Sequence, residues 1–452
     1  MKKKVVGTMF TNQMLVKLII PLILEQILGV LVGMADTVMV SSVGETAVSG
    51  VSLVDTINVL FFTIFSALAT GGSVVSAHFV GQKNNKKASQ AGNQLFRVSL
   101  IAGLAIMLLC LVGNRLLLKL VFGDIEQEVM DNAMTYFMVL SFSFPFMACY
   151  NSCASLFRVM GNSKISLYCS FVMNVLNIGG NWFLLYVVKM GVAGVALAST
   201  VSRMVALIIM IVLLAKPDQI IVLERKFSLR LKMNMVRKIL QIGVPNGLET
   251  GIFQIGKVLV LSLVTSFGTA AIAANAVGNT ISTFQNMAGG AIGLAMITVV
   301  GQCIGAGEYD QAKYYSKKLL GIAYLAMFVT NLIALLGVIP FLGTIFHLSS
   351  ETADLARQIL LLSAAGAMFI WPVSFTLPNA LRAAGDVNYA MVVSIISMWV
   401  WRVGFSVILG KYFGMGLMGV WVSMVIDWIC RGICFFIRFQ RGKWVYGMAK
   451  KA

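Results

Sequence analysis

The sequence predicts an all-α polytopic membrane protein with twelve transmembrane helices in two six-helix bundles. The first observation behind this prediction is composition: of 452 residues, 59% are hydrophobic and only 12% are charged, whereas soluble domains carry about 25% charged residues. The second is that apolar stretches of about twenty residues, long enough to cross roughly 30 Å of hydrocarbon, recur along the whole chain. These stretches are continuous rather than alternating, which favours helices over a β-barrel. The third is an internal repeat, which groups the helices into two bundles.

The continuous apolar stretches place the predicted spans. They cover residues 14–39, 51–80, 93–114, 129–154, 165–188, 191–215, 239–264, 273–303, 319–340, 354–381, 388–410 and 416–437. Residues 216–238 interrupt the series with a charged segment that contains Pro217, which indicates a cytoplasmic linker. The expected domains are therefore an N-terminal bundle over residues 1–215, this linker, and a C-terminal bundle over residues 239–452.

The chain carries a formal net charge of +18, and its basic residues lie mainly in the short segments between spans. On the side opposite the N-terminus, the basic residues of the predicted connecting segments are Arg115, Lys119, Lys189, Arg357 and Lys411. The cytoplasmic side of membrane proteins carries the excess of lysine and arginine. This distribution predicts a multi-pass protein of the cell membrane with both termini in the cytoplasm, and it explains the charge without nucleic acid as a partner. Contacts with anionic membrane lipids are compatible with the same pattern.

A shift of 224 residues superimposes the prolines, glycines and charged residues of the two halves. Matched pairs are Pro21 and Pro245, Glu25 and Glu249, Gly44 and Gly268, Arg158 and Arg382, and Gly161 and Gly385. One residue later, "GVAGV" at Gly191 meets "GLMGV" at Gly416. Because six spans separate equivalent points, the halves share one orientation, and we expect a pseudo-twofold axis along the membrane normal. This organisation favours a transporter over an enzyme.

Five segments carry a resemblance to a known family. They are "PLILEQILGVLVGMADTVMVSSVG" from Pro21, "SLFRVMGNSKISLYCSFVMNVLNIGGNWFL" from Ser155, "GVAGVALAST" from Gly191, "GVPNGLETG" from Gly243 and "NALRAAGDVNYAM" from Asn379. With them the chain resembles the bacterial multidrug and toxic compound extrusion (MATE) transporters over essentially its whole length. The resemblance implies a secondary antiporter that admits Na⁺ or H⁺ and expels organic cations. The major facilitator superfamily matches less well, because "GQKNNKKA" from Gly81 lacks its charged loop motif.

One carboxylate, Asp36, lies inside the first predicted span, where an acid costs about 3 kcal/mol unless it is paired, hydrated or functional. Helical rise places it roughly 28 Å beyond Lys17, at a depth similar to that of Asn177, Asn181 and Ser199 on the fifth and sixth spans. Carboxylate, amide and hydroxyl oxygens are the ligands that a small hard cation prefers. We therefore expect Asp36, Asn177, Asn181 and Ser199 to form the ion-coupling site. If Na⁺ is the coupling ion, we expect Asp36, Asn177 and Asn181 to hold it.

The resemblance implies the same assignment, because these positions match the cation site in the family's N-terminal bundle. The family often has aspartate where this chain has Asn181, which counts against a proton relay through two carboxylates and leaves both Na⁺ and H⁺ open. Structural alternatives also stay open: Asp36 could accept a hydrogen bond at the end of its span, and the asparagines and Ser199 could join helices. We expect no other cofactor and no catalytic residue, since the chain has two histidines and no Asp-x-x-Asp pair.

Four further residues are candidates for a substrate cleft: Glu25, Glu249, Gln254 and Lys257. Glu25 and Glu249 each follow a proline by four residues and would suit organic cations, unless each pairs with a nearby lysine or caps backbone freed by its proline. By the resemblance, Gln254 lies near the place where some family members have a glutamate. Lys257 lies too deep in the seventh predicted span for its ammonium to reach water easily. It could bind anions, pair with an acid or move during transport.

These features predict a monomeric exporter that exchanges organic cations or drugs for Na⁺ or H⁺ by alternating access between the two bundles. The alternative is a flippase for lipid-linked or polyanionic glycan precursors, which shares the superfamily's architecture. Lys257, Arg203 and Arg402 in the cleft would favour the flippase, whereas acidic or neutral aromatic residues would favour drug export. Asp427 and Arg431, four residues apart on the last span, are expected to pair.

Overall fold

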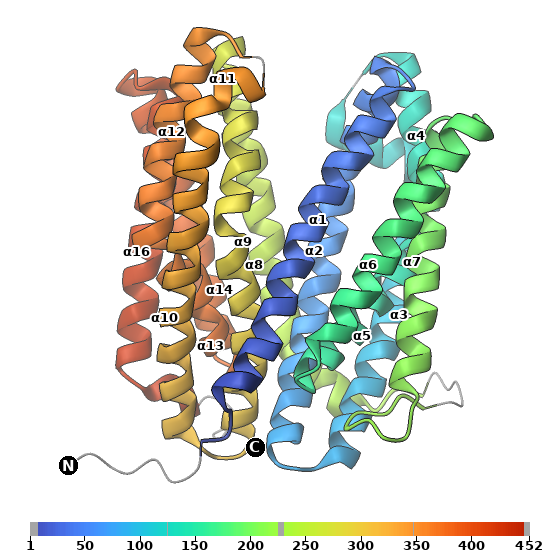
Figure 1. Ribbon diagram of the computed structural model, residues 1–452, viewed down its shortest axis with the longest axis vertical. Helices are drawn as coiled ribbons and strands as arrows, with labels where there is room; N and C mark the ends of the chain where they lie inside the picture. The colour runs from blue at the N-terminus through green and yellow to red at the C-terminus, as the bar shows by residue number, and fades with distance from the viewer. Residues whose placement is uncertain (1–7, 124, 225–229, 347, 447–452) are drawn as a thin grey trace. The chain divides into compact units, whose positions relative to one another are not determined.

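The computed structural model describes residues 8–123, 125–224, 230–346 and 348–446, and these residues form helices that are joined mostly by short turns, with a longer segment between α7 (Val192–Leu214) and α8 (Met233–Thr265) (Figure 1). Within this part of the chain, ten helices are long and apolar enough to cross a membrane. Two more pairs of helices pass the same test together, each pair bent by more than 40° at a short break. Counting each bent pair as one span gives twelve, so the predicted all-α polytopic fold is confirmed.

The chain divides into two compact units. The N-unit comprises residues 12–247, and the C-unit comprises the described residues 8–11 and 248–446. The short N-terminal segment belongs to the C-unit because the backbone of Phe10 exchanges two hydrogen bonds of 2.9 and 2.7 Å with the hydroxyl of Tyr315. The domain borders expected from the sequence, at 215 and 239, stay a prediction.

The described residues of the N-unit form seven helices and one π-helical turn, followed by the start of an eighth helix that continues into the C-unit. They are α1 (Asn12–Ser41), α2 (Glu45–Gly81), α3 (Asn85–Phe122), α4 (Gln127–Ser141), α5 (Phe144–Val159), α6 (Ser163–Trp182), η1 (Phe183–Val187), α7 (Val192–Leu214) and α8 (Met233–Thr265).

The C-unit has the same general plan with more interruptions. Its elements after α8 are α9 (Thr269–Gly305), α10 (Tyr309–Ile333), η2 (Ala334–Val338), η3 (Ile339–Phe341), α11 (Leu342–Ile345), α12 (Ser350–Phe369), η4 (Pro372–Thr376), α13 (Pro378–Ala383), α14 (Val387–Ser397), η5 (Met398–Gly404), α15 (Phe405–Val407), η6 (Ile408–Tyr412), α16 (Gly416–Gln440) and η7 (Lys443–Tyr446).

The internal repeat is present in the backbone geometry of the turns. Gly161 and Gly385, which are matched by the repeat, have φ angles of 79° and 81°. Lys83 and Gly307, separated by the same offset, have φ angles of 55° and 77°. Left-handed backbone is costly for residues with a Cβ and free for glycine. The repeated glycines therefore mark places where each half of the chain needs the same tight turn between helices.

The two bent spans coincide with prolines. The break between α4 and α5 bends the chain by 50°, and Pro145 stands at the start of α5. The break between α12 and η4, which continues into α13, bends the chain by 61°, and Pro372 and Pro378 stand at the starts of η4 and α13. A helix tolerates proline in its first turn, but proline in the interior of a helix removes a backbone hydrogen bond. The bends thus follow from residues that the predicted spans 129–154 and 354–381 already contained.

Each unit has its own buried core. In the N-unit the ring of Phe144 packs against those of Phe61 and Phe65, with centroids 5.2 and 6.4 Å apart. In the C-unit, Nε1 of the buried Trp421 donates a 3.1 Å hydrogen bond to Oδ1 of Asn275. Hydrocarbon offers no water to satisfy such polar atoms. Polar side chains inside the units are therefore informative about structure and function.

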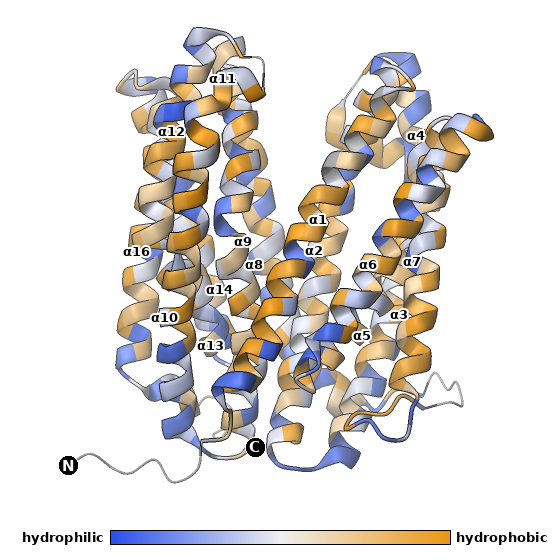
Figure 2. Cartoon of the chain, in the orientation of Figure 1, coloured by the Kyte–Doolittle hydropathy of each residue, from blue (hydrophilic) through white to orange (hydrophobic). Residues whose placement is uncertain are grey.

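The outer surface of the helices is apolar. Along one face of α3, Val112, Leu116 and Leu120 are 90%, 69% and 77% exposed. Figure 2 shows hydrophobic residues along the helices and hydrophilic residues gathered in the turns between them. Exposing such a surface to water would cost about 25 cal/mol per Å². The distribution is that of helices surrounded by lipid.

The segment after α7 is fastened to α3 of the N-unit. The side chain of Asn93 donates to the carbonyl of Val222 at 3.0 Å and accepts from the backbone N–H of Glu224 at 2.9 Å. Arg97 forms an ion pair with Glu224, and the side-chain oxygen of Gln94 accepts from the N–H of Lys232 at 2.9 Å. The described part of the predicted linker therefore packs on the N-unit, while residues 225–229 lie outside the described chain.

Candidate functional site

Helices α1 and α6 meet at Asp36 and Asn181. Nδ2 of Asn181 donates a 2.7 Å hydrogen bond to Oδ1 of Asp36. One turn earlier on α6, Nδ2 of Asn177 donates a 3.0 Å hydrogen bond to Oγ of Ser199 on α7. Asn177 and Asn181 are four residues apart, so they share one face of α6. The four side chains expected at the ion-coupling site thus lie as two hydrogen-bonded pairs on three helices.

Oxygen atoms of this group are available to a cation. Oδ1 of Asn177 and Oδ1 of Asn181 are buried, and neither has a hydrogen-bond partner among the described residues. A buried amide oxygen without a partner costs about 1–3 kcal/mol, and a bound cation would remove that cost. With the carboxylate of Asp36 and the hydroxyl of Ser199, these oxygens have the chemistry of ligands for a small hard cation.

Two further ionisable side chains interact electrostatically with Asp36: Asp55 on α2 and Arg203 on α7. The hydroxyl of Tyr136 lies 3.5 Å from Oδ1 of Asp55, and Nη1 of Arg203 donates a 2.6 Å hydrogen bond to Oγ of Ser143. One arginine against two carboxylates leaves one negative charge, which a single monovalent cation or proton would neutralise. Sequence reasoning left Asp55 and Arg203 out of the expected site. The signal that could have included them is that ionisable residues inside spans mark functional positions.

Glu25 and Glu249 each pair with an arginine of their own unit. Nη2 of Arg158 lies 3.2 Å from Oε1 of Glu25, and Nη2 of Arg382 lies 2.6 Å from Oε1 of Glu249. Both members of the two pairs are matched by the internal repeat, so each half of the chain builds the same contact. The pairs join α1 to α5 and α8 to α13. Substrate contact by either glutamate stays a prediction, and pairing with arginine gives both a structural role.

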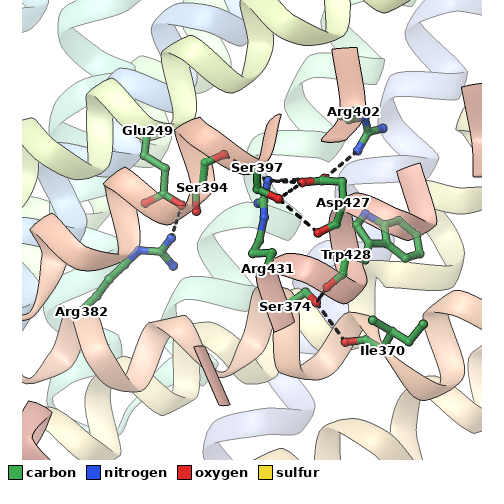
Figure 3. A network of polar contacts seen from close by, with 10 residues as sticks. All are labelled: Glu249, Ile370, Ser374, Arg382, Ser394, Ser397, Arg402, Asp427, Trp428 and Arg431. Atoms are coloured by element: carbon green, nitrogen blue, oxygen red, sulfur yellow. Dashed lines mark hydrogen bonds and ion pairs between the residues drawn. The ribbon is translucent and has the colours of Figure 1, made fainter. Parts of the chain in front are cut away.

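The C-unit contains a second polar network, centred on Asp427 of α16 (Figure 3). The fully buried carboxylate accepts from Nη2 of Arg431 at 3.2 Å, which confirms the predicted pair. Oγ of Ser397 donates to the same oxygen at 2.5 Å. Nη1 of Arg402 lies 3.8 Å from the other carboxylate oxygen. The C-unit counterpart of Asp36 is Val260, so the C-unit does not repeat the acid of the N-unit.

Lys257 and Gln254 lie on α8, near this network. Nζ of Lys257 lies 5.4 Å from the ring centroid of Phe253, and the guanidinium groups of Arg402 and Arg431 lie 5.5 and 5.2 Å from it. Gln254 is half-buried. Of the residues expected in a substrate cleft, the structure thus places Lys257 against an aromatic ring that two arginines also contact, a grouping that spacing along the sequence could not predict.

Long apolar helices, with ionisable residues gathered inside each of two units, are the features of a polytopic membrane transporter. The MatE family model matches the chain twice, over residues 21–183 and over residues 245–408. The starts of the two matches are separated by the offset of the internal repeat. The chain belongs to the MATE family, whose members are transporters and not enzymes.

Relatives match over nearly the whole chain. The chain is 27% identical over 440 residues to the "Uncharacterized transporter YisQ" of Bacillus subtilis, covering 95% of this chain and 94% of that protein. It is 26% identical over 438 residues to the "Probable multidrug resistance protein NorM" of Thermotoga maritima, covering 95% and 92%. Its fold is similar to the crystal structure of MATE in the bent conformation, with a TM-score of 0.87, 20% identity and 97% of each chain covered.

Proposed function

We propose that this transporter exports small organic cations and drugs, and that entry of Na⁺ or H⁺ at Asp36 drives the export. The description of the Thermotoga maritima relative as a multidrug resistance protein supports drugs as the substrates. The observation that carries the coupling is the contact between Asp36 and Asn181, beside two buried amide oxygens that have no partner among the described residues.

The proposed coupling works through charge. A cation held between Asp36 on α1 and the amide oxygens of Asn177 and Asn181 on α6 would draw these helices together. Its release would leave the carboxylate unneutralised at membrane depth, where a charge is costly. Occupancy would therefore change the relative stability of two packings of the N-unit, which is the differential binding that any ligand-driven shift requires. The membrane potential adds about 2.3 kcal/mol per charge per 100 mV to inward ion entry.

We further propose that the chain works as a monomer in the cell membrane, with both termini in the cytoplasm and alternating access between its two halves. The distribution of lysine and arginine supports the orientation. Glu25, Glu249 and Gln254 remain the candidates for contact with a cationic substrate. Because both glutamates are paired, a substrate cation would have to compete with Arg158 or Arg382 for the carboxylate.

One observation favours a second candidate function, a flippase for lipid-linked or polyanionic glycan precursors. Lys257, Arg402 and Arg431 surround the ring of Phe253, which is a basic rather than an acidic environment. Phosphate groups of a lipid-linked precursor would suit these side chains. This candidate requires transport of a lipid, whereas the first requires transport of a soluble cation.

The experiment that tests the proposed function is transport of ethidium, an organic cation, by the purified protein in proteoliposomes. Na⁺ and pH gradients are imposed separately, because either ion could couple. We expect one gradient to drive ethidium across the membrane against its own gradient, and dissipation of that ion gradient to stop the movement. Ethidium movement that is the same with and without ion gradients would indicate a passive channel and would reject the proposal.

A further inference from the structure

Three basic side chains of the C-unit converge on one aromatic ring. Lys257 of α8, Arg402 of η5 and Arg431 of α16 all lie within 5.5 Å of the ring centroid of Phe253. Together they form what we call the basic cluster. Cation–π contact stabilises each group by about 0.5–2 kcal/mol but does not remove its charge.

The basic cluster contains more positive than negative charge. Asp427 is its acidic partner, in contact with both Arg402 and Arg431. The neighbouring carboxylate of Glu249 is already occupied by Arg382 (Figure 3). The ammonium of Lys257 and the guanidinium of Arg402 repel each other. Three cations against one carboxylate leave two positive charges, and an anion placed between them would lower the electrostatic energy.

The fold of the repeated bundle does not require these charges. The repeat matches Phe253 with Gly29 and Lys257 with Gly33 on α1. On the last helix of each half, where the offset is one residue longer, Arg431 is matched with Ala206 of α7. The N-unit thus has small uncharged residues at these three matched positions. The basic cluster is therefore an addition to the C-unit, and a functional reason accounts for it better than a folding reason.

One hydrogen-bond donor of the cluster is also left without an acceptor. The side chain of Arg431 is 3% exposed, and its Nε has no hydrogen-bond partner among the described residues. The side chain of Arg402 is 12% exposed, and that of Lys257 is exposed. Ionisable residues within membrane-spanning helices almost always face the bundle interior or a water-filled cavity rather than lipid. The cluster therefore has an accessible side at Lys257 and an unsatisfied donor at Arg431.

Aromatic rings continue from the cluster. The guanidinium of Arg431 lies between the rings of Phe253 and Phe375, 5.2 and 4.8 Å from their centroids. The rings of Phe375 and Trp371 are stacked, with centroids 4.9 Å apart. Such surfaces favour flat aromatic molecules, and guanidinium groups favour planar carboxylates. The two preferences point to a single kind of ligand.

We propose that the basic cluster binds the carboxylate of a soluble aromatic compound, so that the substrates include aromatic carboxylates and zwitterions besides organic cations. The proposal rests on the transport function proposed above and specifies its substrate class. A lipid-linked glycan is the weaker candidate for this site, because stacked rings offer few hydrogen bonds to sugar hydroxyls. Asp427 holds Arg402 and Arg431 in place, whereas Lys257 and Arg402 supply the accessible charges.

The test compares two dyes that share a xanthene frame, fluorescein with a carboxylate and the cation rhodamine 123. Their binding to the full-length protein in detergent is measured by fluorescence anisotropy, without any ion gradient, so that failure of ion coupling leaves the result unaffected. The variants are Lys257→Gln and Arg402→Gln. Lys238→Gln, an exposed position on the same helix, is the matched control. Arg431 is left intact because its loss would strand the buried Asp427.

We expect the wild-type protein to bind fluorescein, and benzoate to displace it. Each variant should lower the affinity for fluorescein relative to rhodamine 123 about tenfold, as expected for loss of one charged hydrogen bond, whereas Lys238→Gln should not change the ratio. Lys257→Glu should lower the affinity for fluorescein relative to rhodamine 123 further, because it replaces a positive charge with a negative one. Absence of fluorescein binding, or the same ratio in wild type and both variants, would overturn the proposal. Displacement by phosphatidylglycerol but not by benzoate would assign the cluster to a lipid headgroup and would also overturn it.

Discussion

Asn181 donates its side-chain N–H to the carboxylate of Asp36 at 2.7 Å, and this contact turns the amide so that its oxygen has no partner among the described residues. The amide oxygen of Asn177, on the same face of α6, also has no hydrogen-bond partner among the described residues. A carboxylate and two unpaired amide oxygens therefore occupy neighbouring positions in the N-unit. This arrangement is costly without a ligand and suits a monovalent cation.

Replacing Asn181 with aspartate should shift the transporter toward protons. In Asn181→Asp the second carboxylate would stand at hydrogen-bond distance from Asp36, and two carboxylates so close share a proton. We expect the ratio of pH-driven to Na⁺-driven ethidium transport to rise about tenfold, equivalent to about 1.4 kcal/mol. Transport in proteoliposomes with each gradient imposed separately measures the ratio. A ratio equal to that of the wild-type protein would show that residue 181 does not contribute to ion choice.

The pairing of Glu249 with Arg382 should be essential for stability. The side chain of Glu249 is only 8% exposed. Arg382→Met would therefore leave a buried carboxylate without its partner. We expect a loss of about 3–5 kcal/mol in the free energy of unfolding, seen as a lower thermal midpoint in detergent. The double variant Glu249→Leu with Arg382→Met should recover most of the loss, because the charge is removed with its partner.

The control for this pair is Arg357→Met. Arg357 and Asp354 form an ion pair at 3.1 Å whose side chains are 44% and 65% exposed. Exposed pairs contribute about 0–1 kcal/mol, so the thermal midpoint should hardly move. Equal effects of Arg357→Met and Arg382→Met would contradict the structural role assigned to the buried pair.

Gly419 of α16 should not tolerate a side chain. A Cβ added there would lie 2.7 Å from the backbone carbon of Leu409 and 2.8 Å from the backbone nitrogen of Gly410. Gly419→Ala must therefore separate α16 from η6, and we expect a loss of about 1–3 kcal/mol, again measured as a thermal midpoint. Gly321→Ala on α10 is the control, since a Cβ there meets nothing within 4 Å. An unchanged midpoint in Gly419→Ala would show that this contact can relax freely.

Much of the fold could be predicted because hydropathy and the repeat both act over long stretches of chain. The spans follow from apolar runs, and the matched Gly161 and Gly385 do mark equivalent left-handed turns. The π-helical segments, such as η5 from Met398 to Gly404, could not be predicted. They depend on which backbone hydrogen bond forms within a turn, and an apolar sequence allows several.

The candidate site was only partly accessible to sequence reasoning. Depth along a helix brought Asp36 and Asn181 to the same level, because helical rise is uniform. Partners such as Arg158 for Glu25 could not be deduced from local spacing, since the two residues are 133 positions apart. The repeat held a usable signal here, because the glutamate and the arginine are both matched in the second half.

The central claim is that cation entry at the carboxylate of Asp36 drives transport. Its most direct test is to measure gradient-driven export of ethidium by Asp36→Asn. Asp131→Asn, the same substitution at an exposed position of the N-unit, controls for insertion and folding. We predict that Asp36→Asn, purified as a folded protein, exports ethidium no faster with an ion gradient than without one, while Asp131→Asn matches the wild-type protein. Wild-type rates of gradient-driven export in Asp36→Asn would contradict the account.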